Sequence, residues 1–292
     1  MSDLQGGTPV GSNRSESGTG LIPVSIDLAG KAHWDQMWEH EAFPPDIDPQ
    51  SDSIWGHRDR LFHETLQRIL ANRPKGLSLV ELGCARSAWL PYFAREFQCR
   101  VSGLDYSALG AQQTGERLRE AGIPGEVRCA DLFAPPGEWI GAFDLVVWFG
   151  VAEHFADTTG AIRAAAALLK PGGLLITEIP NLAGVNGWLQ RWLNRPVYDI
   201  HVPLSARELA AHHAAADLRV VAADYVVPTD FGVVDIDELP PGPERRLKDW
   251  LLYVLRIFGG CVWWLDRRIG PFRPGRLTGG FVIVAAEKPA TV

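Results

Sequence analysis

Residues 80–87, with the sequence VELGCARS, decide the fold. They close an apolar run over Leu77–Leu82 and precede a segment, Ala88–Phe97, that predicts a helix. A strand that turns into a helix through small residues lets the backbone approach a ligand closely, and the N–H groups at the helix start favour a negative group. The alternative is a tight turn that packs for its own sake, because Gly83 is the one glycine where a nucleotide-binding loop usually has three.

The strand–helix pattern continues along the chain. Apolar runs separated by helices of about 10–15 residues indicate parallel βαβ units with helices on both faces of one sheet, which is an α/β fold. Strands are expected at Arg100–Leu104, Glu126–Cys129, Phe143–Phe149, Leu174–Ile179, 218–227 and 280–286, with helices over Ala108–Ala121 and Thr159–Leu169.

Acidic residues follow the second and third predicted strands. Asp105 stands 22 positions after Gly83 (105 − 83), and its carboxylate can accept both hydroxyl hydrogens of a ribose. Asp131 can accept the exocyclic amine of an adenine whose ring lies against Leu132. For each aspartate the alternative is a cap on the following helix or loop. Because parallel strands end at one edge of a sheet, where ligands bind, we expect both carboxylates to face the Gly83 turn.

Two further motifs complete a family pattern. They are LLKPGG at 168–173, before the fifth predicted strand, and Glu153-His154, after the fourth. With the segments above, over about residues 77–225 and a last strand near 280, they resemble the class I S-adenosylmethionine-dependent methyltransferases. The resemblance implies a Rossmann-like, seven-stranded, mostly parallel sheet and S-adenosyl-L-methionine as the cofactor. It implies cofactor-binding roles for Glu81, Gly83, Ala85, Asp105, Asp131, Leu132, Phe149 and Gly150.

The loop departs from the family pattern, because Ala85 and Ser87 replace common glycines. These small side chains narrow the loop without blocking it, so we expect cofactor binding to survive. The rival class is a dinucleotide-dependent dehydrogenase, whose loop and ribose acid look alike. Its loop needs glycines to meet a pyrophosphate, and its pattern has no place for Asp131 or LLKPGG, so we favour the methyltransferase.

Two histidines are the candidate catalytic residues. His154 follows the fourth strand and could act as a general base for a hydroxyl, or pack between strand and helix. His201 precedes Ser205 and Glu208, which have capping-box spacing, an arrangement similar to that of ubiquinone-type O-methyltransferases. Some members of that family have an acidic metal ligand three residues before the Glu-His pair, where this chain has Gly150. We therefore predict no metal.

Tryptophans suggest an apolar acceptor site. Trp188 and Trp192 are four residues apart and share one helical face in the segment 181–203, which we interpret as a lid over the acceptor, with core packing as the alternative. Trp34 and Trp38 pair in the same way in an N-terminal helix of the kind that many relatives fold over the cofactor. Trp38, Trp188 and Trp192 are thus predicted to bind substrate.

Residues 244–276 differ in charge from the rest of the chain. They hold eight basic and three acidic residues, a net charge of +5, which leaves 20 basic and 32 acidic residues, or −12, elsewhere. Inside this segment, Trp250–Leu265 is apolar apart from Arg256 and is interrupted by Gly259-Gly260. Either an inserted helical hairpin packs on the domain, or tryptophan-rich helices with basic flanks meet the membrane interface.

Composition narrows the function further. The 292 residues carry a net charge of −7, which argues against a nucleic-acid partner. Four dispersed cysteines without a C-x-x-C pair and no visible signal peptide favour the cytoplasm, either free or peripheral at the inner face of the membrane. We expect a disordered tail at 1–25, a helical cap at 26–75, and a methyltransferase domain at 76–292 with a helical insertion at 240–276.

The expected function is methyl transfer to a small-molecule acceptor that is hydrophobic or lipid-linked, with oxygen the favoured atom. A saccharide, an amine or a natural-product intermediate is the alternative acceptor, and a non-catalytic cofactor-binding module is the alternative class. No pattern in the sequence indicates an oligomeric state.

Overall fold

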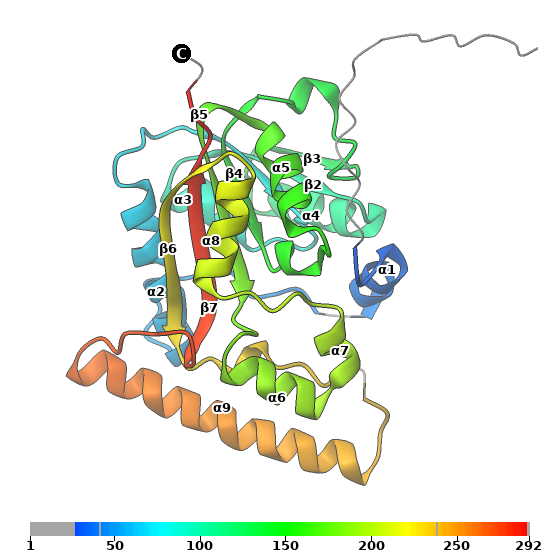
Figure 1. The fold of residues 1–292 in the computed structure, drawn as a ribbon, viewed down its shortest axis with the longest axis vertical. Helices are drawn as coiled ribbons and strands as arrows, with labels where there is room; N and C mark the ends of the chain where they lie inside the picture. Colours follow the sequence, from blue (N-terminus) through cyan, green and yellow to red (C-terminus); the bar gives the residue numbers. More distant parts are fainter. Residues whose placement is uncertain (1–26, 41, 238, 291–292) are drawn as a thin grey trace, which may run out of the picture.

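A computed structural model describes residues 27–40, 42–237 and 239–290. The predicted tail, 1–25, lies outside the described residues. The described chain forms one sheet with helices on both faces (Figure 1).

The predicted seven-stranded, mostly parallel sheet is confirmed. Its strand order is β3-β2-β1-β4-β5-β7-β6, and β7 runs antiparallel to both of its neighbours. The order reverses beside β1, so β1 and β4 diverge where ligands bind in open α/β sheets. The strands are β1 (Ser78–Leu82), β2 (Arg100–Asp105), β3 (Gly125–Cys129), β4 (Phe143–Phe149), β5 (Leu169–Pro180), β6 (Arg219–Pro228) and β7 (Gly279–Glu287).

Apolar residues from the helices build a separate core on each face of the sheet. One core includes Phe62 and Leu66 of α2 and Phe93 of α3, and the other includes Ile162 of α5 and Leu209 of α8. The helices are α1 (Lys31–His40), α2 (Ile54–Leu70), α3 (Trp89–Glu96), α4 (Ala108–Glu120), α5 (Thr158–Ala167), α6 (Val185–Leu193), α7 (Arg195–Asp199), α8 (Ala206–Ala215) and α9 (Pro243–Ile269), with short 3-10 turns η1 (Gly137–Trp139), η2 (Ala152–His154) and η3 (Phe231–Val233).

The KPGG turn after α5 is a bulge in the sheet. Phe143 pairs with Leu169 and Leu145 pairs with Leu174, so residues 170–173 loop out between two ladder contacts. Gly172 has a φ of +77°, which favours glycine there. β5 therefore begins at Leu169, five residues before the start at Leu174 that the sequence predicted (174 − 169).

The prediction that Gly259-Gly260 breaks the segment into a hairpin is wrong. α9 runs unbroken over 27 residues and lies along one end of the molecule beside α6 (Figure 1). Gly259 is buried, and a Cβ on it would lie 3.0 Å from the carbonyl oxygen of Thr229. The glycine thus lets the helix approach the loop after β6 instead of ending the helix. Among the described residues, no helix is both long and apolar enough to cross a membrane.

Candidate active site

The turn after β1 requires a glycine for two reasons. Gly83 has a φ of +68°, and a Cβ on it would lie 2.6 Å from Cγ2 of Val151. Its N–H donates to the carbonyl oxygen of Leu104 at 2.8 Å, which ties the turn to the end of β2. The backbone of the turn is therefore held open where a ligand can approach it.

The carboxylate of Asp105 faces this turn, as predicted. Its Oδ2 accepts the N–H of Ala85 at 2.9 Å, and its Oδ1 accepts the N–H of Ser107 at 2.8 Å. Burial raises the pKa of Asp105 to about 6, against the opposing effect of these two N–H donors. Each oxygen keeps a lone pair for a further donor.

Both departures from the expected glycines have structural partners. Ala85 packs against Gly110 of α4, where a second Cβ would lie 2.5 Å away from its own. The hydroxyl of Ser87 donates to the carboxyl of Glu81, a buried group whose pKa burial raises to about 8. Glu81 therefore organises the loop from within through Ser87.

A cavity of about 700 Å³ opens at this edge of the sheet. Its wall includes both Asp105 and Asp131, the latter an exposed residue whose Oδ1 also accepts the N–H of Phe133 at 2.9 Å. Asp131 therefore caps the loop that follows it and lines the cavity at the same time, so the two interpretations do not exclude each other. All eight residues predicted to bind the cofactor line this cavity: Glu81, Gly83, Ala85, Asp105, Asp131, Leu132, Phe149 and Gly150.

Helix α1 closes one side of the cavity. Trp38 lines the cavity, and its carbonyl oxygen accepts hydrogen bonds from Arg86 and from Gln113 of α4. The guanidinium of Arg86 also lies over the Trp38 ring, 5.9 Å from its centroid. α1 is thereby attached to the loop that surrounds the cavity.

A second pocket of about 100 Å³ adjoins the first. Trp34 and His154 line both pockets, and their rings meet edge to face with centroids 4.8 Å apart. His201 lines the smaller pocket but not the larger one. The rings of Trp34 and His154 therefore form the partition between a large and a small compartment.

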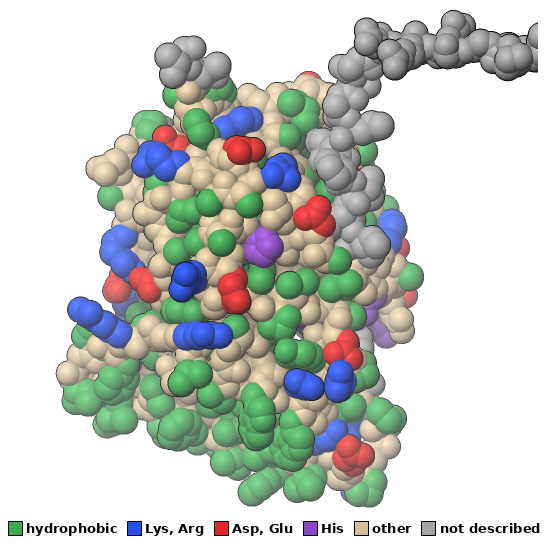
Figure 2. All heavy atoms as spheres, in the orientation of Figure 1, with side chains coloured by type: hydrophobic (Ala, Val, Ile, Leu, Met, Phe, Trp, Pro, Cys, Tyr) green, Lys and Arg blue, Asp and Glu red, His purple; other side chains and the backbone are tan. Residues whose placement is uncertain are grey.

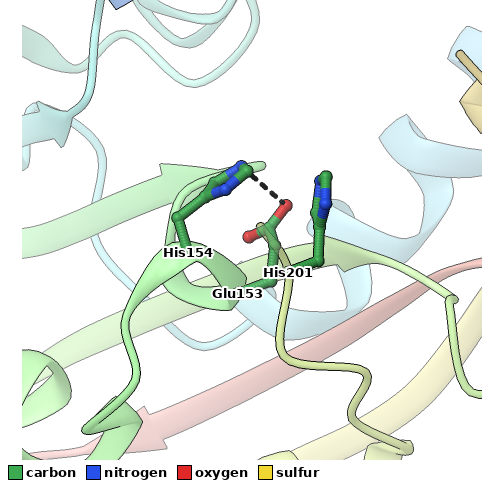
Figure 3. A group of neighbouring side chains, drawn as sticks. All are labelled: Glu153, His154 and His201. Carbon is green, nitrogen blue, oxygen red and sulfur yellow. Dashed lines mark ion pairs between the residues drawn. The ribbon is translucent and has the colours of Figure 1, made fainter. Parts of the chain in front are cut away.

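The two candidate catalytic histidines lie side by side, with centroids 4.4 Å apart, on either side of Glu153 (Figure 3). Two backbone contacts bring them together: Ile200 accepts from Nδ1 of His154 at 3.0 Å, and the N–H of Val202 donates to the Glu153 carbonyl at 2.6 Å. Nδ1 of His201 lies 2.6 Å from the carbonyl of Val197. Because a carbonyl only accepts, both imidazoles carry their proton on Nδ1 and have a lone pair on Nε2.

Burial favours the uncharged form of each group in this cluster. It raises the pKa of Glu153 well above its usual range, lowers that of His154 to about 3, and lowers that of His201. Nε2 of His154 lies 4.0 Å from Oε1 of Glu153, a contact in which burial disfavours the charged form of both groups. Oε2 of Glu153 is buried and finds no hydrogen-bond partner among the described residues.

Glu153, His154 and His201 could also hold a metal ion. One ligand atom from each lies within 4.8 Å of the others. A Cβ on Gly150 would lie 3.8 Å from Oε1 of Glu153, so the position where some relatives have an acidic ligand does face the cluster. The sequence predicted no metal because Gly150 stands where some relatives have an acidic ligand. The structure adds His201 to the Glu153-His154 pair and so supplies a candidate set of three ligands.

Comparisons with known proteins agree with this geometry. A family model described as a methyltransferase domain matches residues 54–223, more than half of the chain. The chain belongs to this family. It is a class I S-adenosylmethionine-dependent methyltransferase by fold and sequence, and its cofactor is S-adenosyl-L-methionine.

The curated relatives that this chain is similar to include ubiquinone biosynthesis O-methyltransferases. A ubiquinone biosynthesis O-methyltransferase of Methylobacterium sp. (strain 4-46) is 33% identical over 52% of this chain, which spans 64% of that relative's length. One of Methylobacterium nodulans is 30% identical over 71% of this chain and 88% of its own. A geranyl diphosphate C-methyltransferase from Streptomyces coelicolor A3(2) has a similar fold, with a TM-score of 0.53, 17% identity and coverage of 87% and 96%.

The cavity of this methyltransferase fits its cofactor. The Gly83 turn is a cradle that any Cβ would fill, and Asp105 still has lone pairs that can accept ribose hydroxyls. Leu132 and Phe133 provide apolar surface beside Asp131, as an adenine ring requires. These residues would hold the nucleoside along the ends of β1, β2 and β3.

The predicted roles of Trp188 and Trp192 in the methyltransferase are not met. The two rings stack on each other with centroids 6.2 Å apart, but they are 67% and 60% exposed and line neither pocket. The opposite face of α6 carries Leu189 and Leu193, which are buried against η3 and α9. Because the leucine face of α6 packs in the core, the tryptophans on the other face project into solvent.

Sequence reasoning missed two features of the site. Glu153 was noted only as part of a motif. In the structure it lies between the two histidines, and its buried Oε2 has no hydrogen-bond partner among the described residues. Tyr106 and Arg58 also line the large cavity. Tyr106 could have been suspected, because it directly follows Asp105, the last residue of β2. Arg58 had no such signal, because α2 reaches the cavity through tertiary packing alone.

Proposed function

We propose that this chain transfers a methyl group to a hydroxyl oxygen of a small acceptor that is hydrophobic or lipid-linked. S-adenosylmethionine supplies an electrophilic methyl group on a sulfonium. The single observation that carries the proposal is the pair of compartments that share His154 and Trp34. One compartment suits the nucleoside, and the other suits the part of the acceptor that must meet the methyl group.

The small pocket favours an apolar acceptor with a polar reacting end. Met37, Leu182, Val197 and Val233 contribute apolar surface to it. Both His154 and His201 line this pocket, and each keeps a lone pair on Nε2 because its Nδ1 is occupied by a backbone carbonyl. A hydroxyl placed there would donate to an imidazole while its carbon skeleton lies against the apolar wall.

The two histidines have different tasks in this proposal. The pKa of His154, lowered to about 3 by burial, makes it a poor place to hold a proton but leaves its Nε2 free to orient the hydroxyl. The negative charge of Asp235 opposes the lowering of the His201 pKa, and Asp235 lines the same pocket. His201 therefore takes the proton as the oxygen attacks, and His154 positions the oxygen.

The test is methyl transfer from labelled cofactor to phenolic, catecholic and prenylated hydroxyl acceptors. We expect His201→Ala to lower kcat by about 10²–10⁴-fold, as is usual for the loss of a general base, and to leave cofactor affinity unchanged. His154→Ala should raise KM for the acceptor as well as lower kcat. His212→Ala is the control, because His212 contacts Thr159 on α5, outside both pockets.

Three results would count against this proposal. Full activity of both histidine variants would remove the proton-transfer roles. Transfer to amines or saccharides with no transfer to hydroxyls would replace oxygen as the accepting atom. Tight cofactor binding without turnover on any acceptor class would favour a binding module.

A further inference from the structure

The solvent-facing side of α9 is apolar. Nine of the nineteen exposed large apolar side chains in the described part of the chain belong to this helix. Leu247, Trp250, Val254, Ile257, Trp264 and Leu265 recur at helical spacing along one side, which we call the outer face. Figure 2 shows apolar side chains gathered along the end of the molecule that α9 forms. A surface helix normally presents polar groups to water, so this face is adapted to another environment.

The inner face of α9 is already packed on the domain. Leu252 and Trp263 are buried, and Nε1 of Trp263 donates to the carbonyl oxygen of Pro228 at 2.8 Å. Asp266 is buried at 2.9 Å from Nε2 of His57 on α2. The outer face is therefore a second apolar surface, opposite the one that holds the helix in place.

Arginines stand at both ends of the outer face. Arg246 precedes Trp264 by 18 residues and Arg268 follows Trp250 by 18, which is five helical turns in each case. Both arginines are exposed and thus share the side of the tryptophans. The guanidinium of Arg268 lies 5.0 Å from the centroid of Trp264.

The carboxylates of α9 lie elsewhere. Glu244 pairs with Lys248 at 2.7 Å, and Asp249 lies 3.8 Å from Arg245. Asp266 is buried on the inner side. The outer face thus combines apolar and cationic groups without an acidic residue, on a chain whose net charge is −7.

We propose that the outer face of α9 docks on the surface of an anionic lipid bilayer. Tryptophan, leucine and isoleucine beside arginine match the headgroup region, where the rings enter the apolar boundary and the guanidinium groups meet lipid phosphates. A second copy of the chain fits the face less well. A two-fold pairing of α9 helices brings arginine against arginine in either direction, with no carboxylate to compensate.

Docking would place the acceptor pocket close to the bilayer. Arg256 of α9 donates to the carbonyl oxygen of Val234 at 3.2 Å, and the neighbouring residues Val233 and Asp235 line the small pocket. One loop therefore separates α9 from the pocket. This consequence rests on the proposed function, whereas the docking itself does not, because it can be measured without turnover.

Vesicle flotation of the full chain tests the proposal. We expect wild type to float with vesicles of phosphatidylcholine and phosphatidylglycerol, and to bind pure phosphatidylcholine more weakly. Trp250→Glu with Ile257→Glu should reduce the bound fraction by about tenfold or more, because two exposed side chains lose their burial in lipid. Ile140→Glu is the matched control, since Ile140 is 48% exposed and lies outside α9. Thermal unfolding and cofactor binding confirm that each variant is folded.

A fluorophore on the outer face gives a second readout. Cys261 follows Trp250 by 11 residues, about three turns, and is exposed, so an environment-sensitive dye on it should shift to the blue with anionic vesicles. The same dye on Cys129, which is exposed at the end of β3, should not shift. Each position is labelled in a chain whose other exposed cysteine is changed to serine.

Two outcomes would overturn the proposal. The outer face would be shown not to meet lipid if wild type stayed unbound to anionic vesicles. The same would follow if the bound fractions of wild type and of the double glutamate variant were equal. A dimer in solution that the double variant dissociates, with no flotation of wild type, would show that a second copy covers the face. Cofactor binding stays intact in either case, so neither outcome is confused with failure of methyl transfer.

Discussion

A Cβ on Gly110 would lie 2.5 Å from the Cβ of Ala85, so the loop after β1 and the helix α4 share a space that holds one methyl group. Ala85 stands where relatives commonly have a glycine, and Gly110 provides the room that this glycine would have given. The altered loop pattern is therefore offset by a residue 25 positions later (110 − 85). We therefore expect cofactor binding to depend on this pair as a unit.

Substitution of Gly110→Ala should destabilise the loop. Overpacking at a tight contact costs about 1–3 kcal/mol, so we expect a lower thermal midpoint and weaker cofactor binding by calorimetry. The double variant Ala85→Gly with Gly110→Ala should recover most of both losses, because the methyl group has moved from one side of the contact to the other. Gly115→Ala on the same helix is the control, since nothing lies within 4 Å of its added Cβ. Equal effects of the two glycine substitutions would contradict this account.

Cofactor affinity should fall in acid. Burial holds the pKa of Asp105 at about 6, above the ordinary value of a carboxyl group, and the ionised form is the better acceptor for ribose hydroxyls. The ionised fraction, and with it the association constant, should drop about tenfold from about pH 7 to about pH 5. Calorimetric titration across this range measures the change. Asp105→Asn should bind weakly with little pH dependence, and a wild-type profile in that variant would remove Asp105 from the site.

Zinc should inhibit the enzyme, whereas chelation alone should not. Glu153, His154 and His201 offer ligand atoms within 4.8 Å of one another, and Zn²⁺ favours two histidines with a carboxylate. Zinc bound there would occupy the Nε2 lone pairs that the acceptor needs. Glu153→Gln should weaken inhibition by at least about 10–100-fold, because loss of a group that only supports a ligand already costs that much and Glu153 is itself a candidate ligand. Loss of activity in EDTA alone, restored by a divalent cation, would mean that the cluster holds a required metal.

Trp38 and Trp188 should behave differently although both are tryptophans on amphipathic helices. Trp38 lines the large cavity and supports Arg86, so Trp38→Ala should weaken cofactor binding by about tenfold through lost aromatic and cation contacts. Trp188 is 67% exposed, so Trp188→Ala should change the free energy of unfolding by less than about 0.5 kcal/mol. Turnover of a water-soluble acceptor should be unchanged in the Trp188 variant. A large KM increase there would restore the lid interpretation of α6.

Much of the cofactor site could be predicted because its signals are local. Gly83, Asp105 and Asp131 each lie at or just after the end of a strand that the sequence predicted, and the sheet brings such ends to one edge. The histidine cluster was harder, because His201 reaches Glu153 through the bonds of Ile200 and Val202, 46 and more positions along the chain. Helical spacing paired Trp188 with Trp192, but it did not indicate which face of α6 is buried.

The amino-acid sequence by itself determined the strand order along the chain, the residues at the strand ends and the family to which they belong, because each depends on neighbours a few positions away. Tertiary structure decided the rest. It turned Gly259 inward so that α9 continues, sent Trp188 and Trp192 to solvent, and joined two compartments at His154. These outcomes depend on which of several apolar faces finds a partner, and that is settled by packing between distant segments.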